Sequence, residues 1–323
     1  MRVLVTGMGA AIGTRVTNLL EADERVEEIL GVDIDPPRRR IHRADFRRVD
    51  PRDRRKLVRI VRDFEPTAVI HLGVYEPDAR SGPRLARDLT HAFTVGALGA
   101  AAESEGLDRI VVRSGIEVYG RGRGAPTRPD ESVVPAPTTA FGHTLLETEN
   151  MAREIGAVAS AAVTALRCAP IVGPHIASPL GRLLRLPVVP VGALSDLPFS
   201  LVHERDAAVA FTKALDCGFD GAINVVAEGA VTPIQAARIG GRAIAPTLGP
   251  SWWIASIVAE VLGAPLPSHV RELLVRGRSA DGAFAAKTLG MVPEHTTPDV
   301  IRDLFEWASV TYLRGAEDED ADD

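Results

Sequence analysis

The first 35 residues, MRVLVTGMGAAIGTRVTNLLEADERVEEILGVDID (Met1–Asp35), decide the fold. The run Arg2–Thr6 is short and aliphatic, which predicts a buried strand, and apolar residues at helical spacing predict a helix that begins at Ala11. A second apolar run, Ile29–Val32, predicts another strand and leads directly into Asp33. Gly7 and Gly9 lie in the turn before this helix, and Gly13 lies in its first turn. This order, with the acid about 20 residues past the glycines, is typical of a dinucleotide-binding βαβ unit.

Each part of this unit has a physical task. Glycines let the backbone turn tightly and let a pyrophosphate approach without a Cβ in the way, and the N–H groups that open the helix at Ala11 point at the phosphates. The Asp33 carboxylate can accept hydrogen bonds from both ribose hydroxyls of an adenosine, whereas a 2′-phosphate would meet a like charge. We therefore expect NAD rather than NADP, although the arginines at 38–40 soften that repulsion.

Composition excludes several classes of protein. The 323-residue chain has a formal net charge of −6, which gives no reason to expect a nucleic-acid partner. The arginines that gather in Arg38–Arg62 are expected to be a solvated face, with a binding patch as the alternative. Cys168 and Cys217 are too few for a disulfide framework, and His175 and His269 show no metal-ligand spacing. We expect no metal and a reducing, cytoplasmic location.

Three segments bear on membrane association and disorder, namely the N-terminus, Trp252–Gly263 and the C-terminal tail. The N-terminus is itself the first strand, so no targeting segment is expected there. The segment Trp252–Gly263 is too short to span a bilayer and contains Glu260, so we expect no integral membrane segment. An amphipathic helix packed on the protein is the expected structure, and a peripheral membrane or partner contact is the alternative. The acidic tail Glu317–Asp323 is expected to be disordered.

Alternating strands and helices predict an α/β fold with a doubly wound parallel Rossmann sheet. Beyond the opening unit, strands are expected at 44–50, 67–72, 109–112 and 163–167, and helices at 51–64, 84–105 and 138–155. Residues 1–173 are expected to form the NAD-binding domain, with returning segments at about 198–228. Residues 174–316 are expected to form mainly a smaller, interleaved substrate-side lobe. In such sheets ligands bind at the carboxyl ends of the strands.

Several ordered motifs resemble those of the extended short-chain dehydrogenase/reductases, the NAD-dependent sugar epimerases and dehydratases such as UDP-glucose 4-epimerase. The family's T-G-x-x-G-x-x-G appears as Thr6–Gly13, with Ala10 in place of the middle glycine, its V-Y-G as Val118–Gly120 and its L-R…G-P element as Leu166–Pro174. The resemblance implies NAD, a nucleotide or nucleotide-sugar ligand and a possible homodimer. The cofactor-binding residues that follow from the motifs and the sheet edge are Gly7, Gly9, Ala10, Ala11, Ile12, Gly13, Asp33, Asp50, Leu72, Gly73, Val74 and Ser114.

The chain departs from the family where the chemistry is expected. In the family a Tyr-x-x-x-Lys pair works with a Ser or Thr, because the lysine lowers the pKa of the tyrosine that exchanges the substrate proton. The matching positions here are Phe141, Leu145 and Gly115, with Ser114 beside the last. Phenylalanine has no exchangeable proton and leucine no charge. We therefore predict an NAD(H)-binding protein without the usual hydride-transfer machinery, acting as a sensor, scaffold or partner subunit.

An enzyme with non-standard catalytic residues is the alternative. Its candidate catalytic residues are Glu117, Tyr119 and Thr144, which lie in or beside the altered motifs. For each one a structural role is the competing interpretation. Two further sets could contact a nucleotide or serve only structure, namely the arginines Arg182, Arg185, Arg276 and Arg278 and the tryptophans Trp252 and Trp253.

Overall fold

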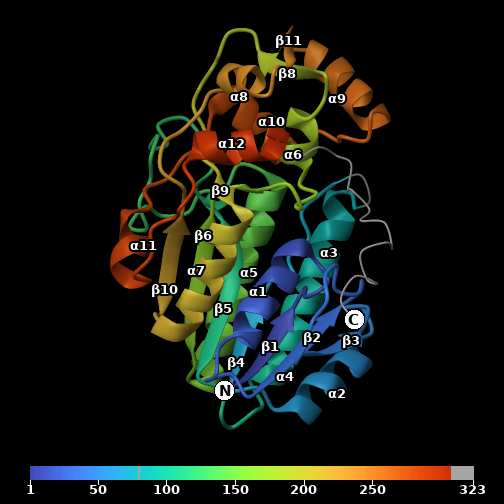
Figure 1. Ribbon diagram of the computed structural model, residues 1–323, viewed down its shortest axis with the longest axis vertical. Helices are drawn as coiled ribbons and strands as arrows, with labels where there is room; N and C mark the ends of the chain where they lie inside the picture. The colour runs from blue at the N-terminus through green and yellow to red at the C-terminus, as the bar shows by residue number, and fades with distance from the viewer. Residues whose placement is uncertain (79–80, 307–323) are drawn as a thin grey trace, which may run out of the picture.

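A seven-stranded parallel sheet forms the centre of the computed structural model, which describes residues 1–78 and 81–306 (Figure 1). The spatial order of its strands is β10-β6-β5-β4-β1-β2-β3. The strands are β1 (Arg2–Thr6), β2 (Glu28–Asp33), β3 (Asp45–Arg48), β4 (Ala68–His71), β5 (Arg109–Gly115), β6 (Ala162–Cys168) and β10 (Gly221–Val225). The order reverses after β1, which pairs with β2 on one side and β4 on the other. The predicted doubly wound α/β fold is confirmed.

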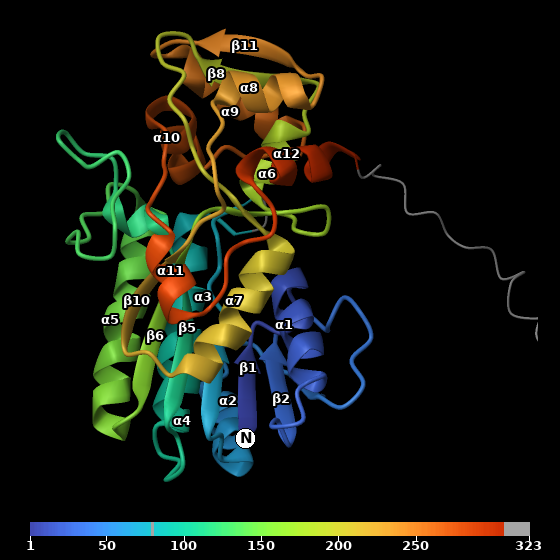
Figure 2. The ribbon, with the colours of Figure 1, turned by 60° about the vertical axis from the view of Figure 1, so that its left-hand side comes forward.

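Helices cover both faces of the sheet because β1 is apolar on both sides. Val3 and Val5 pack into one core with α1 (Ala11–Glu21) and α7 (Glu204–Cys217), which lie side by side in Figure 2. Leu4 packs into the other core. That core also receives α2 (Arg54–Phe64), α3 (Pro83–Phe93), α4 (Gly99–Ala101) and part of α5 (Ala140–Ala159). Burial on both faces explains why the parallel strands read as continuous apolar runs.

Two helix predictions need correction. The helix expected from Pro51 begins at Arg54, because the Asp53 side chain caps it by accepting the Lys56 N–H. The helix expected over 84–105 is interrupted after α3 by a π-helical segment, Thr94–Leu98, before α4. There the Thr94 hydroxyl donates to the Thr90 carbonyl, one of the side-chain bonds that bend helices.

A smaller lobe lies beyond the carboxyl edge of the sheet (Figure 1). Its core is built from α6 (Pro179–Leu184), β8 (Val188–Gly192), α8 (Pro233–Ile239), β11 (Ala243–Thr247), α9 (Ser251–Val261), α10 (Ser268–Arg276) and α12 (Thr297–Glu306). The short parallel pair β7 (Ile171–Val172) and β9 (Val202–His203) lies between the lobe and the sheet. The chain then returns through α7 and β10, and α11 (Ala283–Thr288) packs beside β10.

Two membrane-related expectations meet the structure differently. Within residues 1–78 and 81–306, no helix has the length and apolar character needed to cross a membrane. The helix expected near Trp252 exists as α9, and it packs on the core of the lobe through Trp252 and Ala259. These are its two buried side chains, so its outward side is apolar as well and the helix is not amphipathic. The expected disorder of the tail Glu317–Asp323 concerns residues outside the described part of the chain.

A candidate dinucleotide cleft and its apolar end

The glycine turn after β1 leaves no room for side chains. Gly7 has a φ of +73°, a conformation that favours glycine. A Cβ on Gly9 would lie 2.0 Å from the Asp35 carbonyl oxygen, and one on Gly13 would lie 2.1 Å from the Gly7 carbonyl oxygen. Backbone from three segments therefore meets at this turn, and α1 begins directly behind it at Ala11. The turn has the close backbone approach and helix N-terminus that a pyrophosphate site needs.

Asp33 is fixed at the end of β2 by the turn. Its Oδ2 accepts a hydrogen bond from the Gly9 N–H at 2.8 Å, and its Oδ1 accepts one from the Ile34 N–H at 2.6 Å. The side chain is buried, and this burial raises the pKa of Asp33 to about 6. The carboxylate therefore has lone pairs to offer an adenosine ribose and is ionised at neutral pH.

The cavity beside Asp33 fits a nucleotide. It has a volume of about 330 Å³ and is also lined by Ala10, Val74 and Tyr75. The Tyr75 hydroxyl is buried and has no hydrogen-bond partner within the described residues, which is costly unless a ligand supplies one. Burial raises the pKa of that phenol, so it remains a donor. An unpartnered hydroxyl beside the Asp33 carboxylate suits a ligand that carries ribose hydroxyls, such as the adenosine end of NAD.

Three cavities follow one another from Asp33 to Phe141. The one beside Asp33 shares Ala10, Arg38, Glu76 and Ala177 with a second of about 160 Å³, which Ala11 and Ile12 also line. The second shares Glu76, Arg113, Ile171 and Ser178 with a third, which holds only about 30 Å³, little more than a water molecule. Together they form a cleft along the carboxyl edge of the sheet, as the strand order requires.

The remaining predicted cofactor residues differ in whether they contact the glycine turn or line the cleft. Leu72 and Gly73 contact Gly7, and the Gly73 N–H donates to the Thr6 hydroxyl. Asp50 is not among the residues that line the three cavities; its carboxylate is paired at 2.6 Å with Arg52. Ser114 lines the third cavity.

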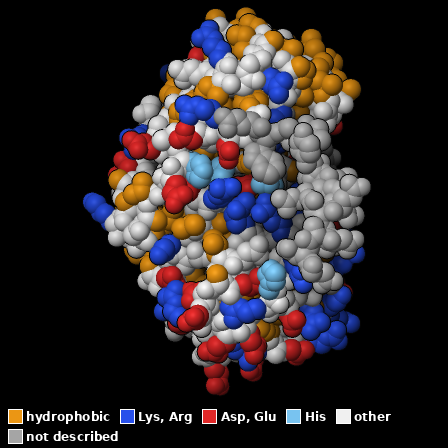
Figure 3. Space-filling model, viewed as in Figure 1, with side chains coloured by type: hydrophobic (Ala, Val, Ile, Leu, Met, Phe, Trp, Pro, Cys, Tyr) orange, Lys and Arg blue, Asp and Glu red, His pale blue; other side chains and the backbone are white. Residues whose placement is uncertain are grey.

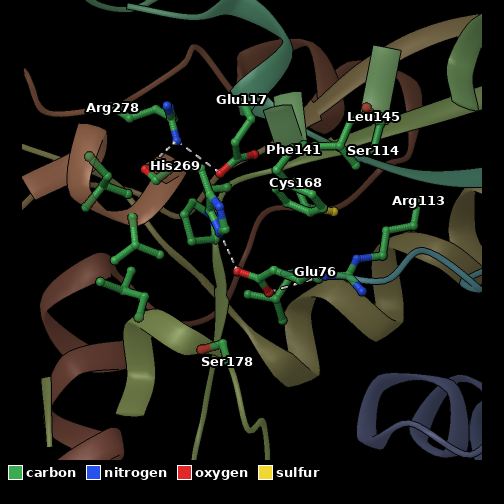
Figure 4. A pocket seen from close by; sticks show the side chains of 17 residues that line it. Glu76, Arg113, Ser114, Glu117, Phe141, Leu145, Cys168, Ser178, His269 and Arg278 are labelled. Carbon is green, nitrogen blue, oxygen red and sulfur yellow. Dashed lines mark hydrogen bonds and ion pairs between the residues drawn. The ribbon is translucent and has the colours of Figure 1, made fainter. Parts of the chain in front are cut away.

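The wall of the third cavity is apolar where Phe141 and Leu145 line it (Figure 4). Phe141 and Leu145 lie one turn apart on α5, and both side chains are buried against the cavity. Gly115 faces them from the end of β5, where a Cβ would lie 2.3 Å from Glu117 Oε2 and 3.1 Å from Leu145 Cδ1. Glu117 and Leu145 thus fill the space that a serine at position 115 would need.

A buried ion-pair network stands beside this wall. Glu117 Oε1 lies 3.3 Å from Arg278 Nη1, and Arg278 Nη2 lies 2.5 Å from Glu272 Oε2. All three side chains are less than one-tenth exposed, so each charge depends on the others. Of the four arginines considered as possible nucleotide contacts, Arg278 is the one that lines the cavity. Arg276 is exposed, Arg185 bonds backbone carbonyls, and Arg182 lies on α6.

A histidine and a glutamate form a second polar pair in the cavity. His269 Nε2 lies 2.9 Å from Glu76 Oε1, and Glu76 Oε2 lies 4.0 Å from Arg113 Nη2. The imidazole also packs on Phe141, with ring centroids 4.8 Å apart, and the two rings lie together in Figure 4. His269 Nδ1 is buried without a hydrogen-bond partner among the described residues. No motif points to His269 or Glu76, because the fold alone brings them to Phe141.

Two of the three candidate catalytic residues lie outside the cavity lining. The Tyr119 hydroxyl donates to Asn224 Oδ1 at 2.8 Å and accepts from Arg167 at 3.0 Å. Arg167 in turn forms two hydrogen bonds with the buried Glu149, which also accepts the Ser114 hydroxyl at 2.5 Å. Thr144 donates to the Ala140 carbonyl of its own helix. Glu117 is the candidate that reaches the cavity.

A histidine cluster lies away from the cleft. His203, His295 and Asp303 place ligand atoms within 4.8 Å of one another, a spacing that a metal ion can use. However, His203 Nδ1 accepts the Arg205 N–H, so a neutral His203 carries its proton on Nε2, which lies 3.0 Å from Asp303 Oδ2. Hydrogen bonds within the protein therefore account for this cluster, in which the rings of His203 and His295 are stacked.

Comparisons with known proteins agree with this geometry. The chain is 29% identical to an uncharacterized protein of Mycobacterium tuberculosis (strain H37Rv), over 96% of this chain and 84% of that one. It matches the structure of a UDP-glucose 4-epimerase from Thermotoga maritima with UDP-glucose at a TM-score of 0.74 and 20% identity, covering 95% of this chain and 98% of the other. A UDP-glucose 4-epimerase from Brucella ovis in complex with NAD matches at a TM-score of 0.73 and 20% identity, covering 93% and 96%.

The family assignment rests on a match that spans most of the chain. Residues 3–225 match the model of the NAD dependent epimerase/dehydratase family. The matched range contains the glycine turn, Asp33 and positions 115, 141 and 145. NAD, the cofactor of this family, is the one predicted from Asp33. The chain belongs to the NAD dependent epimerase/dehydratase family.

Proposed function

We propose that this protein binds NAD(H) along the cleft from Asp33 to Phe141, with its adenosine beside Asp33. The buried Asp33 carboxylate, held by the Gly9 and Ile34 N–H groups, is the observation that carries the proposal. The family and the NAD complex of the Brucella ovis enzyme support it. When bound, NAD would supply a hydride acceptor next to the third cavity.

Calorimetric titration tests this binding directly. We expect NAD to bind more tightly than NADP, because Asp33 repels a 2′-phosphate. The variant Asp33→Ala is expected to lose at least tenfold in affinity for NAD, whereas Asp45→Ala, which removes an exposed acid on β3 that lies outside the cavity lining, changes it little. Equal affinities of the wild-type protein for NAD and NADP would contradict the proposed role of Asp33.

We propose further that the protein does not perform the family's Tyr/Lys hydride transfer and acts as a sensor, scaffold or partner subunit. The apolar side chains of Phe141 and Leu145 support this, because neither can take a proton from a hydroxyl or hold a positive charge. The small third cavity supports it as well, because a sugar needs more than about 30 Å³. Addition of UDP-glucose or UDP-galactose to the NAD-loaded protein is expected to produce no reduced-nicotinamide absorbance.

An enzyme acting on a nucleotide sugar with other residues is the second candidate, as an epimerase, dehydratase or reductase. The specific observation in its favour is that Glu117 and the His269–Glu76 pair line the third cavity, so groups able to exchange protons are present. This function predicts reduced-nicotinamide absorbance with a UDP-sugar, and its loss in Glu117→Gln or His269→Asn. The control is Thr144→Val, which removes a hydroxyl that bonds only within α5.

Assembly and location are also proposals. We propose a homodimer through α3 and α5, which pack on each other and present Arg87 and Glu147 as an exposed pair at 2.9 Å. Light scattering would measure the mass of the particle. A cytoplasmic location is supported by the free thiols of Cys168 and Cys217, since reduced cysteines persist in a reducing compartment.

A further inference from the structure

Three buried polar atoms without a partner belong to residues of the cleft. On the outer surface, where Figure 3 shows acidic and basic side chains scattered over one face, water satisfies such atoms. In the interior a protein group or a ligand must do so. Among the residues that the structure describes, six buried side-chain polar atoms have no hydrogen-bond partner, and three of them are on residues that line the cleft: the Tyr75 hydroxyl, His269 Nδ1 and Arg278 Nε. The first lies at the Asp33 end, so the other two mark the opposite end.

His269 and Arg278 contact each other at the third cavity (Figure 4). Arg278 Nη1 donates to the His269 carbonyl oxygen at 3.5 Å, and the exposed fraction is 3% for His269 and 2% for Arg278. Their other side-chain nitrogens have partners. His269 Nε2 lies 2.9 Å from Glu76 Oε1, and the two Nη atoms of Arg278 face Glu117 and Glu272. One nitrogen of each side chain is therefore left for a group inside the cavity.

The two free nitrogens have opposite hydrogen-bonding roles. Arg278 Nε carries a hydrogen and is a donor only. In neutral His269 the ring proton is on Nε2, which faces the Glu76 carboxylate, so Nδ1 has a lone pair and is an acceptor. A group that satisfies both must accept from Arg278 and donate to His269. Water, a hydroxyl and a primary carboxamide can do this, whereas a carboxylate or a ketone cannot donate.

The size and place of the cavity limit which group this is. Its volume of about 30 Å³ admits one small polar group and no sugar ring. It shares the lining residues Glu76, Arg113, Ile171 and Ser178 with the second cavity, so a ligand that lies along the cleft from Asp33 meets it with its far end. In NAD the end far from the adenosine is the nicotinamide, whose carboxamide combines an amino donor with a carbonyl acceptor.

We propose that His269 and Arg278 bind the carboxamide of NAD. His269 Nδ1 accepts from the amino group, and Arg278 Nε donates to the carbonyl oxygen. This inference rests on the proposed binding of NAD in the cleft and assigns the residues that hold its nicotinamide end. Both residues come from α10 or the segment just after it, so bound NAD would connect the smaller lobe to the sheet.

Titration calorimetry with two analogues of NAD tests the two contacts on the wild-type protein. Acetylpyridine adenine dinucleotide has a methyl group in place of the amino group, so it cannot donate to His269. Thionicotinamide adenine dinucleotide keeps the amino group but has sulfur, a weaker acceptor, in place of the carbonyl oxygen that faces Arg278. We expect the first to bind about tenfold and the second about fivefold more weakly than NAD.

The variant His269→Gln isolates the contact of the histidine. A glutamine amide can take the place of imidazole Nε2 and keep the bond to Glu76, but it has no atom at the position of Nδ1. The difference between NAD and the acetylpyridine analogue should therefore fall below about twofold, while the difference for the thionicotinamide analogue remains. His143→Gln is the matched control, because His143 is exposed on α5 and lines none of the three cavities, and it should keep both differences.

The outcomes distinguish carboxamide binding from an ordered water in the cavity. Equal affinities of the wild-type protein for NAD and the acetylpyridine analogue overturn the inference, because the cavity would then hold water only. A difference that persists in His269→Gln overturns it as well. If the analogues bind equally but Asp33→Ala still weakens NAD binding, the proposed NAD binding stands and this inference alone fails. If NAD does not bind to the wild-type protein, both fail.

Discussion

The two ends of the cleft are built in different ways. The adenosine end depends on backbone, since the Gly7–Gly13 turn and two N–H groups position Asp33. The other end depends on side chains, because Phe141, Leu145 and the pairs of Glu117 with Arg278 and of His269 with Glu76 fill it. The two ends should therefore respond to substitution for different physical reasons. At the turn an added Cβ meets backbone, whereas at the other end a changed side chain leaves a buried charge without its partner.

The largest expected effect on stability is at the end of the cleft near Phe141. Arg278→Met leaves Glu117 and Glu272 buried without their shared cation, which should lower the free energy of unfolding by about 3–5 kcal/mol. Arg276→Met is the matched control, since Arg276 approaches the same Glu272 at 3.8 Å but is exposed, and it should cost less than about 1 kcal/mol. Denaturant unfolding measures both. Equal losses would mean that the buried network does not hold this end together.

The glycine turn should respond almost as strongly. In Gly13→Ala the new Cβ meets the Gly7 carbonyl oxygen and must displace backbone, which should cost about 3 kcal/mol and abolish NAD binding. Gly99→Ala has open space around its Cβ and should be stabilising by up to about 1 kcal/mol. Denaturant unfolding curves and NAD titrations of the two variants measure both effects. If Gly13→Ala bound NAD with the wild-type affinity, the close backbone approach at the turn would not be needed for binding.

A pH titration isolates Asp33. Its folded pKa of about 6 lies above the usual value near 3.8, so the folded state holds this proton more tightly and its contribution to stability falls as pH rises from about 4 to 6. NAD needs the ionised form, so affinity should rise with pH up to about 7 and be about tenfold weaker at pH 5 than at its plateau. Calorimetry at several pH values measures this. The profile should flatten in Asp33→Asn and persist in Asp45→Asn; a flat wild-type profile would contradict it.

The smallest effect is expected at Asp50, which lies outside the cleft lining. Its carboxylate is 39% exposed and is paired with Arg52. Asp50→Ala should therefore change the affinity for NAD less than about threefold and the free energy of unfolding by less than about 1 kcal/mol. Titration calorimetry gives the first value and denaturant unfolding the second. A tenfold loss of affinity would show that the adenosine end extends to Asp50 through a side chain.

The position of Asp33 beside the glycine turn could be predicted from sequence because these residues are close together in the chain. Gly7, Gly9, Gly13 and Asp33 all belong to one βαβ unit, whose spacing fixes their geometry. The other end could be predicted only as a loss, at Phe141 and Leu145. What fills it comes from distant segments: His269 lies on α10, and no periodicity relates it to Glu76 or to Phe141.

Two helical segments also show what the local sequence cannot predict. The sequence predicts a helix at α9, but not which partner its apolar side lacks, because burial is a property of the whole fold. The sequence likewise predicts a continuous helix through Thr94–Leu98, since the composition there is that of an ordinary helix.

Gly115 has a consequence for protein engineering. A serine placed there would bring its Cβ against Glu117 Oε2 and Leu145 Cδ1, so both side chains would have to move. Moving Glu117 would break its pairing with Arg278, and a lysine placed at 145 would enter a buried site that holds no partner for it. A serine, a tyrosine and a lysine could therefore be introduced at positions 115, 141 and 145 only together with changes in the neighbouring ion pairs.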